Sequence, residues 1–385
     1  MTKQRRRRIR NCILARFPQY FKVSERESEL GPNVLIQDAN FPLEASRAEK
    51  IMIFLVPEHN AMSGGIYSII SIANQMHKLK RLHGHEVLTM TRPTKERLTY
   101  FRNTHFRNAE NIFRFKQILR CKSAKEIYIH CPEYTAVDSF LDCLSFDELN
   151  YLVHREKIHI NILNQNIKLM PDPESFKGLR KLATSMSQSV AHHAYYNLTT
   201  ANKYSLPTIL LPAYTDLSGY IPSRFHEKEK LIIYSPDPAP FKSKCLGKIA
   251  AAFPTFELVE IHDISFDTYM EFATSCMFSI TFGEGFDGYL AQPIYQGGIG
   301  FAVYNDDFFP SPNFKNFYNI FENEDQLLEC ICERMAILSQ DADAYEALNK
   351  QLKAEYDKLY SYNEYIDQIK KLSLKEFDLL PSSQI

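Results

Sequence analysis

Hydrophobic residues recur along most of this chain in two alternating patterns. From residue 51 onward, short apolar runs of the kind buried in parallel sheets alternate with segments that repeat apolar residues at helical spacing. The first pair is the run 51–56 and the segment from Ile66 to Leu79, which ends near Gly84. Further strands are predicted at 86–90, 126–130, 159–163 and 208–211, and helices near 146–155, 174–184 and 193–204. This alternation predicts an α/β fold with right-handed crossovers.

The alternation starts again after a polar stretch at 215–230, which contains Gly219 and Pro222 and is typical of a linker. Strands are predicted at 231–235, 256–261, 277–282 and 300–304, helices near 243–253, 265–275 and 287–297, and a helical region at 324–376. We therefore predict two Rossmann-like domains, at 50–215 and 216–375, between a basic extension at 1–49 and a tail at 376–385. Ligands of such units bind at the carboxyl ends of the strands, which here means the cleft between the domains.

Composition supports two domains in an ordinary globular protein. The 385 residues exceed what one hydrophobic core usually serves, and 45% are hydrophobic and 24% charged. The net charge of -1 argues against a nucleic-acid binder that works through global charge. The chain lacks a run of about 18 apolar residues and the features of a signal peptide, so we expect a cytoplasmic protein. The eight cysteines include no CxxC pair, and no bound metal is predicted.

The segment from Phe278 to Tyr304 is the most informative part of the sequence. An apolar run delivers Glu284 to the carboxyl edge of a parallel sheet, and glycines at 283, 285 and 288 let the backbone approach a ligand closely. The helix that follows would aim its free N–H groups at an anion. The pattern predicts a phosphate site, although a glycine-rich turn with an incidental carboxylate would look the same.

Three other segments follow predicted strands in the same way. Met62-Ser63-Gly64-Gly65 is a glycine turn before the first helix, and Ile129-His130-Cys131-Pro132-Glu133 ends a strand. The third segment runs from Tyr234 to Lys244 and includes Lys242. Each has an ordinary explanation, namely a tight connection, a core histidine or a solvated lysine. Glu133 is the weaker candidate in its segment, because acidic residues are common at helix starts.

Together these four segments resemble the GT-B glycosyltransferases, especially retaining family four, along most of 51–375. The resemblance implies that Glu284 binds hydroxyls of the donor sugar and that His130 positions this sugar. It also implies that Lys242, or alternatively Lys244, contacts the donor phosphates. The remaining implied donor-binding positions are the Gly64 and Gly65 turn, the backbone around Phe286, Asp287, Gly288 and Tyr289, and Gln292 at the ribose.

The sequence departs from the family pattern at two positions. Gln292 stands where the second glutamate is expected, and Pro236 stands where the family usually has an arginine. A glutamine keeps a carbonyl acceptor for a ribose hydroxyl but lacks the charge. The run Asn164-Gln165-Asn166 and the pair His192 and His193 could line the acceptor side of the cleft, although such residues also suit ordinary strand-end loops.

The resemblance implies a glycosyltransferase that moves a sugar from a nucleotide-sugar donor to a glycan or lipid-linked oligosaccharide acceptor, with retention of configuration. Similar enzymes serve capsule and O-antigen synthesis. No cofactor, metal or nucleic-acid partner is expected, and no general base can be assigned. Two alternatives stay open: another GT-B enzyme such as a nucleotide-sugar epimerase, or a degenerate, non-catalytic partner that binds carbohydrate or nucleotide.

The start of the chain is strongly basic. It carries Lys3 and five arginines within its first ten residues, followed by Ile13, Leu14, Phe17 and Phe21. Such a segment could lie on an anionic membrane surface as a short basic amphipathic element, or it could be a plain basic tail. The oligomeric state cannot be predicted from this sequence.

The long helical end of the chain includes Tyr345 to Leu372. It is expected either to cross back and cover the first domain, as in enzymes similar to this one, or to serve an interface.

Overall fold

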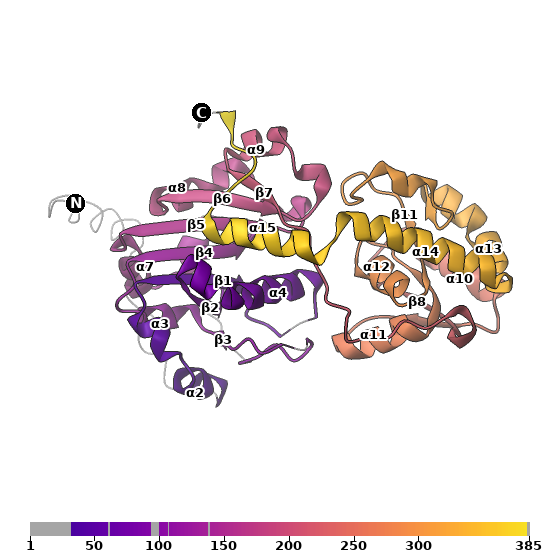
Figure 1. Cartoon of the computed structure of the whole chain (residues 1–385), viewed down its shortest axis with the longest axis horizontal. Helices are drawn as coiled ribbons and strands as arrows, with labels where there is room; N and C mark the ends of the chain where they lie inside the picture. Colours follow the sequence, from indigo (N-terminus) through magenta and orange to yellow (C-terminus); the bar gives the residue numbers. More distant parts are fainter. Residues whose placement is uncertain (1–31, 61, 94–99, 107, 138, 383–385) are drawn as a thin grey trace.

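The computed structural model describes residues 32–60, 62–93, 100–106, 108–137 and 139–382. It contains two α/β domains side by side along the long axis of the molecule (Figure 1). The basic segment at the start of the chain lies outside the described residues. No described helix is both long enough and apolar enough to cross a membrane.

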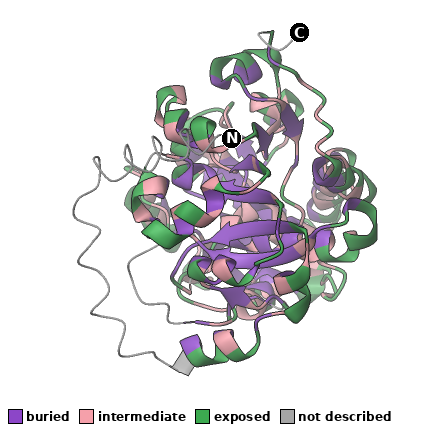
Figure 2. Ribbon diagram, turned by 90° about the vertical axis from the view of Figure 1, so that its left-hand side faces the viewer, coloured by how far each residue is buried: buried purple, intermediate pink, exposed green. Residues whose placement is uncertain are grey.

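The first domain is built on a seven-stranded sheet in the order β3-β2-β1-β4-β5-β6-β7. All the strand pairs within it are parallel. The strands are β1 Lys50–Val56, β2 Glu86–Thr91, β3 Ile112–Phe113, β4 Glu126–Pro132, β5 Lys157–Asn164, β6 Ser185–Val190 and β7 Thr208–Leu210. Figure 2 shows these strands as a buried layer and exposed residues on the outward faces of the helices.

Helices cover both faces of this sheet because consecutive strand residues point to opposite sides. Ile51, Ile53 and Leu55 pack with residues of α3, α6, α7 and α8, whereas Met52 and Phe54 pack with residues of α4 and α15. The helices described before residue 215 are α2 Pro32–Ala39, α3 Leu43–Arg47, α4 Gly64–Lys78, α5 Lys80–His83, α6 Ser139–Cys143, α7 Phe146–Val153, α8 Lys177–Leu182 and α9 Leu198–Tyr204.

The second domain has a five-stranded parallel sheet in the order β12-β11-β10-β8-β9. Its strands are β8 Glu229–Tyr234, β9 Glu257–Glu260, β10 Cys276–Ile280, β11 Ile299–Val303 and β12 Ile320–Phe321. Its helices are α10 Lys242–Ala252, α11 Phe266–Ser275, α12 Gly288–Tyr295, α13 Glu324–Gln340 and α14 Ala342–Leu359. The alternation of strands and helices in both sheets confirms the predicted α/β class.

The last helix, α15 Tyr362–Leu374, leaves the second domain and packs on the first (Figure 1). Its Tyr365 hydroxyl lies 3.1 Å from the Ser71 hydroxyl of α4, and the Tyr128 hydroxyl donates to the Leu372 carbonyl at 3.3 Å. Beyond it, Leu379 pairs with Thr208 as an isolated antiparallel bridge at the edge strand β7. The predicted return of the C-terminal helices to the first domain is therefore confirmed.

Some elements were not predicted. Strand β6 consists largely of small polar residues, and its buried Ser187 and Gln188 hydrogen-bond to Asn161 and Thr208 on the neighbouring strands. The short strands β3 and β12 were missed as well. Residues 32–47, which the sequence placed in a polar extension, form α2 and α3, and Gln37 of α2 is buried and donates to the Ile112 carbonyl. In β6 and around Gln37, hydrogen bonds to neighbouring strands satisfy buried polar groups, so no apolar pattern marks these two places.

Candidate functional site

Glu284 lies in the loop between β10 and α12, and two glycines give this loop its shape. Gly285 has φ of +83°, and a Cβ there would lie 2.5 Å from the Val303 carbonyl oxygen. A Cβ on Gly283 would lie 2.7 Å from the carboxylate of Asp237. Neither position accepts a larger residue without movement, so the loop leaves the sheet in one conformation and holds Glu284 half-buried.

Glu284 meets the other domain through Asn166. The Asn166 Nδ2 group donates to Glu284 Oε1 at 2.5 Å. Asn166 follows the end of β5, and Glu284 follows the end of β10, so the carboxyl ends of strands from both sheets meet at this point. The predicted position of the site, between the domains at the strand ends, agrees with this geometry.

Glu284 stands in acidic surroundings. Burial, followed by the charges of Asp287, Asp237 and Glu133, raises its pKa to about 7, and the charge of Lys168 opposes this rise. The carboxyl group therefore titrates close to neutral pH. Such a perturbed carboxyl at the end of a strand is typical of functional sites.

The first N–H groups of α12, which were expected to face a phosphate, are already bound within the protein. Asp287 is the N-cap, and its Oδ1 accepts hydrogen bonds from the N–H groups of Tyr289 at 2.8 Å and Leu290 at 3.2 Å. Its other oxygen accepts from the Thr281 hydroxyl. A carboxylate thus already binds backbone N–H groups that were expected to face a phosphate. The expectation that the Tyr289 N–H is available to a diphosphate is wrong for this conformation.

The aromatic residues of this segment belong to the domain interior. The Phe286 ring is 9% exposed and stacks on Tyr356 with ring centroids 5.0 Å apart. The Tyr289 hydroxyl donates to the Ile261 carbonyl at 3.5 Å, at the end of β9. The Phe286 ring is therefore out of reach of a ligand, and both backbone polar groups of Tyr289 have partners, since its carbonyl accepts from the Ser279 hydroxyl at 2.7 Å.

Gln292, on the next turn of α12, has an unsatisfied oxygen. Its Nε2 donates to the Thr215 hydroxyl at 3.4 Å, but its buried Oε1 has no partner among the described residues. A Cβ at Gly288 would lie 2.6 Å from this oxygen, so a larger residue there would displace the Gln292 amide. A buried acceptor without a donor calls for a water or a ligand group, and a ribose hydroxyl would satisfy it.

Lys242 opens helix α10 but turns back onto its own domain. Its Nζ donates to the carbonyls of Ser235 at 2.9 Å and Asp237 at 3.3 Å, and pairs with Glu260 at 2.6 Å. In this conformation the ammonium group therefore stabilises the loop after β8. Lys244 lies two residues further on and is exposed.

The glycine turn of the first domain contacts the loop that carries Asn166. Gln165 Nε2 donates to the Gly65 carbonyl at 3.2 Å, and a Cβ on Gly65 would lie 2.9 Å from Gln165 Oε1. Gly64 has no atom within 4 Å of such a position and is exposed. The turn therefore lies at the domain boundary, where Gly65 has a steric reason to be glycine and Gly64 has none.

His130 is in the core rather than at the domain boundary. Its ring is fully buried, stacks on Phe54 at 4.3 Å and lies 4.2 Å from the Tyr128 ring. Burial lowers its pKa well below the usual value, so the imidazole is neutral. A side chain without exposed surface cannot touch a sugar. The buried position of His130 therefore contradicts the expected contact with the donor sugar.

Glu133, the candidate ranked below His130, lies closer to the boundary. Its carboxylate accepts a hydrogen bond from the Gln165 N–H at 3.2 Å, and burial raises its pKa to about 7. The end of β4 thus brings Glu133, not His130, next to the loop that contacts Glu284. Sequence reasoning missed this because both residues belong to the same strand-end segment.

Further contacts join the two domains. The Tyr195 hydroxyl donates to Asp307 at 2.6 Å, and Lys168 Nζ lies 3.9 Å from the same carboxylate. Next to them, His192 packs edge-to-face on Phe308, and its Nε2 lies 2.8 Å from the Gln165 carbonyl oxygen. Asp307 and Phe308 carry no sequence signal of a site, because only the fold brings them opposite residues of the first domain.

Metal binding has no obvious place among the residues that the structure describes. No group of three or more histidine, cysteine, aspartate or glutamate side chains there could hold an ion. The expectation of a metal-free site stays a prediction.

No protein-family model matches the chain, and no curated protein is significantly similar to it in sequence. Solved structures with a similar fold include an alpha-glucosyltransferase in complex with UDP-glucose and DNA containing an abasic site. It has 11% identity and a TM-score of 0.55 over 84% of this chain and 99% of that one. A second structure is an alpha-glucosyltransferase in complex with UDP and a 13-mer DNA containing a HMU base. It has 10% identity and a TM-score of 0.53 over 84% of this chain and 100% of that one.

UDP-GlcNAc 2-epimerase from Neisseria meningitidis bound to UDP-GlcNAc is also similar, with 9% identity over 85% of this chain and 99% of that one. Its TM-score is 0.47, and no argument rests on it. At these identities the likeness concerns the fold alone. This fold is the GT-B arrangement of two Rossmann-like domains, as the sequence predicted.

Proposed function

We propose that this protein is a glycosyltransferase that takes a sugar from a nucleotide-sugar donor. One observation carries the proposal: Glu284, on a glycine-shaped loop at the end of β10, faces Asn166 at the end of β5 across the domain boundary. A sugar bound at this point would meet a carboxylate from one domain and an amide from the other. Both are groups that bind hydroxyls.

Around this point the chain offers groups for each part of a nucleotide sugar. The Glu284 carboxylate would accept hydrogen bonds from the sugar hydroxyls, and Gln292 Oε1 would accept one from the ribose. The diphosphate would lie near the start of α12 and the loop after β8, where Lys242 is the nearest predicted cation. Because Lys242 is paired with Glu260 at 2.6 Å, donor binding would have to draw the ammonium group away from that partner.

The transfer step needs stabilisation of the charge that grows on the departing diphosphate. In the retaining course that the family resemblance implies, the acceptor oxygen bonds to the anomeric carbon on the face from which the diphosphate leaves. The acceptor proton then passes to the leaving phosphate, which departs with the electron pair of the broken bond. Closure of the two domains would exclude water and limit hydrolysis of the donor.

We further propose a glycan or lipid-linked oligosaccharide as acceptor, in the synthesis of a surface polysaccharide. Residues 1–215 contain 31 lysines and arginines and 19 acidic residues, whereas residues 216–385 contain 14 and 27. The basic half includes the predicted acceptor domain, and a lipid-linked glycan carries a phosphate group that such a field attracts. The basic first segment would add contact with an anionic membrane.

The first experiment is thermal stabilisation of the purified protein by UDP, GDP, dTDP, CMP and their common sugar conjugates. A ligand that binds the folded state raises the melting temperature. We expect one nucleotide sugar to stabilise the wild type and to lose this effect in Glu284→Ala. The matched control is Glu271→Ala, an exposed glutamate on α11, which should bind as the wild type does.

The product then separates the alternatives. A larger glycan formed from the stabilising donor supports the transferase, and interconversion of free nucleotide sugars identifies an epimerase. A DNA oligonucleotide with hydroxymethylated bases serves as a second acceptor, and sugar transfer to it would contradict the proposed acceptor class. Stabilisation without any product favours the non-catalytic partner. The capping role of Asp287 and the pairing of Lys242 would then be its physical explanation.

A further inference from the structure

The Asn166 side chain has one possible orientation. Its Oδ1 accepts a hydrogen bond from the Lys168 N–H at 2.9 Å and so caps the short 3-10 helix Ile167–Leu169. Because the oxygen is used within the first domain, the amide nitrogen is the end that reaches Glu284 of the second domain. A plain helix cap would need only the oxygen.

The loop beneath Asn166 is fixed from three sides. The Gln165 N–H donates to Glu133, the Gln165 side chain contacts Gly65, and His192 Nε2 lies 2.8 Å from the Gln165 carbonyl oxygen. These contacts come from the ends of β4 and β6 and from the start of α4. Asn166 is therefore presented to the second domain on a rigid support, which is what a precise contact requires.

The charged groups around Glu284 oppose its ionisation. Asp287 faces it from the start of α12, Asp237 from the loop after β8, and Glu133 from the end of β4. Lys168 opposes this effect with its positive charge, but its side chain is 57% exposed. The Asn166 amide is a hydrogen-bond donor aimed at the carboxylate, and such a bond favours the ionised form.

We propose that Asn166 is a positioning residue, which presents the Glu284 carboxylate to the donor sugar in a fixed orientation when the two domains are closed. An ionised carboxylate only accepts hydrogen bonds, whereas a protonated one also donates, so the two forms recognise different arrangements of hydroxyls. Asn166 thereby couples domain closure to the form of Glu284 that binds the sugar. The inference rests on the proposed function, because it gives Glu284 a sugar to bind.

The experiment compares the wild type with Asn166→Asp and Asn166→Ala. Aspartate keeps the oxygen that caps residues 167–169 but cannot donate to Glu284, whereas alanine loses both contacts. The Glu284 carboxyl is titrated by carbon-13 NMR in protein labelled at the glutamate carboxyl carbon, with Glu284→Gln to assign its signal. We expect the midpoint to rise by about one pH unit in Asn166→Ala, since this is worth about 1.4 kcal/mol, and at least as much in Asn166→Asp.

A second measurement follows UDP-glucose binding by calorimetry at pH 6 and pH 8.5. We expect Asn166→Ala to bind about tenfold more weakly than the wild type at pH 6, with a smaller difference at pH 8.5, because a shift of one unit is tenfold. An equal loss at both pH values would overturn the positioning role, since a lost contact alone is independent of pH. A Glu284 midpoint that is the same in all three proteins would overturn it as well.

The control is Asn197→Asp. Asn197 is another N-cap of the first domain and is exposed, and its side chain hydrogen-bonds to the backbone of Thr200 and Ala194. This variant should leave the Glu284 titration unchanged. Because the titration uses no ligand, it separates the two proposals. If no nucleotide sugar binds the wild type at any pH, the proposed function fails, and the NMR midpoints alone decide whether Asn166 controls Glu284.

Discussion

Gly285 is the position in the Glu284 loop at which the backbone most strongly restricts the type of residue. Its φ of +83° lies in the region that favours glycine, and the Val303 carbonyl stands 2.5 Å from the place of a Cβ. Both constraints act on the same residue. The conformation of the whole loop, and with it the direction of the Glu284 side chain, therefore depends on the absence of a side chain at 285.

Gly285→Ala should destabilise the protein by roughly 2 kcal/mol or more, because a strained backbone conformation costs about 1 to 3 kcal/mol and the new methyl group must displace a carbonyl. Nucleotide-sugar stabilisation should be lost with it. The free energy of unfolding in urea and the thermal shift measure the two effects.

Gly247→Ala on α10 is the matched control. No atom lies within 4 Å of a Cβ at this exposed helix position, so alanine should be neutral or stabilise by up to about 1 kcal/mol through its helix propensity. Equal stability of Gly285→Ala and the wild type would show that the loop adopts another conformation.

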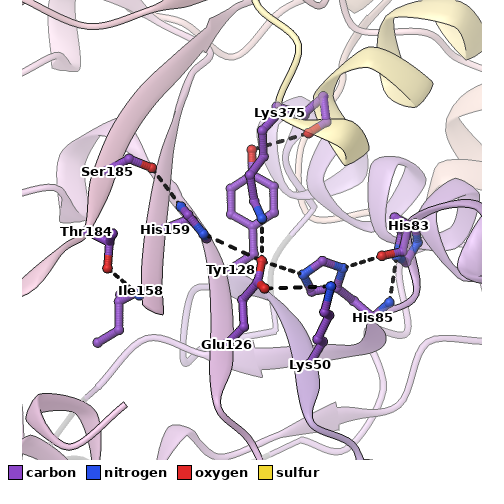
Figure 3. A network of polar contacts seen from close by, with 11 residues as sticks. Lys50, His83, His85, Glu126, Tyr128, Ile158, His159, Thr184, Ser185 and Lys375 are labelled. Atoms are coloured by element: carbon purple, nitrogen blue, oxygen red, sulfur yellow. Dashed lines mark hydrogen bonds and ion pairs between the residues drawn. The ribbon is translucent and has the colours of Figure 1, made fainter. Parts of the chain in front are cut away.

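At the scale of elements, α15 is fastened to the first domain at its end (Figure 3). Lys375, just after the helix, donates to Glu126 at the start of β4 at 2.5 Å. His85, His159 and Lys50 also lie within 4 Å of this carboxylate, at 3.5, 3.5 and 3.8 Å. Burial would raise the pKa of Glu126, but Lys375, then His85 and Lys50, lower it to about 2.

The contribution of this network to the free energy of unfolding should fall as the pH decreases from about 6.5 to 4. Burial and the charge of Lys375 lower the pKa of both His85 and His159 from 6.5 to about 4. The unfolded chain therefore binds more protons in this range, and protonation favours it. Below pH 4.5, protonation of Glu126, whose pKa is about 2 when folded, removes further stability. Urea denaturation at pH 7.5, 6 and 4.5 measures the slope.

Lys375→Met tests the same network. It should cost about 1 to 3 kcal/mol at pH 7.5 because Glu126 loses its closest cation. The cost should shrink as the pH falls, because His85 and His159, without the opposing charge of Lys375, then take up protons and pair with Glu126. Lys370→Met is the control, since Lys370 pairs with Asp367 on the exposed face of α15, and it should change stability by less than about 0.5 kcal/mol. A pH-independent cost for Lys375→Met would contradict the network.

At the scale of the whole molecule, the end of the chain completes the core of the first domain. Tyr365, Ile369 and Leu372 of α15 are buried against α4 and the sheet. Burial of such a side chain contributes about 1.5 to 3 kcal/mol. The first domain is therefore incomplete without a helix that follows the second domain in sequence.

Ile369→Ala should destabilise the first domain by about 2 to 5 kcal/mol, because it leaves a cavity beneath a fully buried side chain. Calorimetry should show a lower midpoint temperature for the unfolding transition of the first domain. Leu374→Ala is the matched control on the same helix, since Leu374 is 43% exposed and its loss should cost less than about 0.5 kcal/mol. An unchanged transition in Ile369→Ala would mean that α15 does not stabilise the first domain.

Much of this architecture could be predicted because buried strands and helices carry recognisable patterns of apolar residues in the sequence. Strand β1 shows it as an unbroken apolar run with both faces covered. Strand β6 shows none, since its buried polar residues are satisfied by neighbouring strands that the sequence does not identify. The glycines around Glu284 were informative for a similar reason, because a backbone constraint acts on a single residue.

Pairwise relations in the candidate site could not be predicted. His130 and Glu133 lie three residues apart in one segment, yet one is fully buried in the core and the other contacts the Asn166 loop. Asp287 has a carboxylate in the predicted site segment, but one of its oxygens caps α12 and the other accepts from the Thr281 hydroxyl. Which partner a polar group finds depends on residues far away in the chain.

The sequence by itself determined the two α/β units, the strand ends that would carry a site, and the glycine loop that presents Glu284. These follow from local rules, namely hydrophobic period and backbone conformation, that act over a few residues. The tertiary structure decided that Asn166 meets Glu284, that His130 lies in the core, and that α15 covers the first domain. The contacts of Asn166 and of α15 join segments more than 100 residues apart, and His130 packs on a different strand, so no local pattern encodes them.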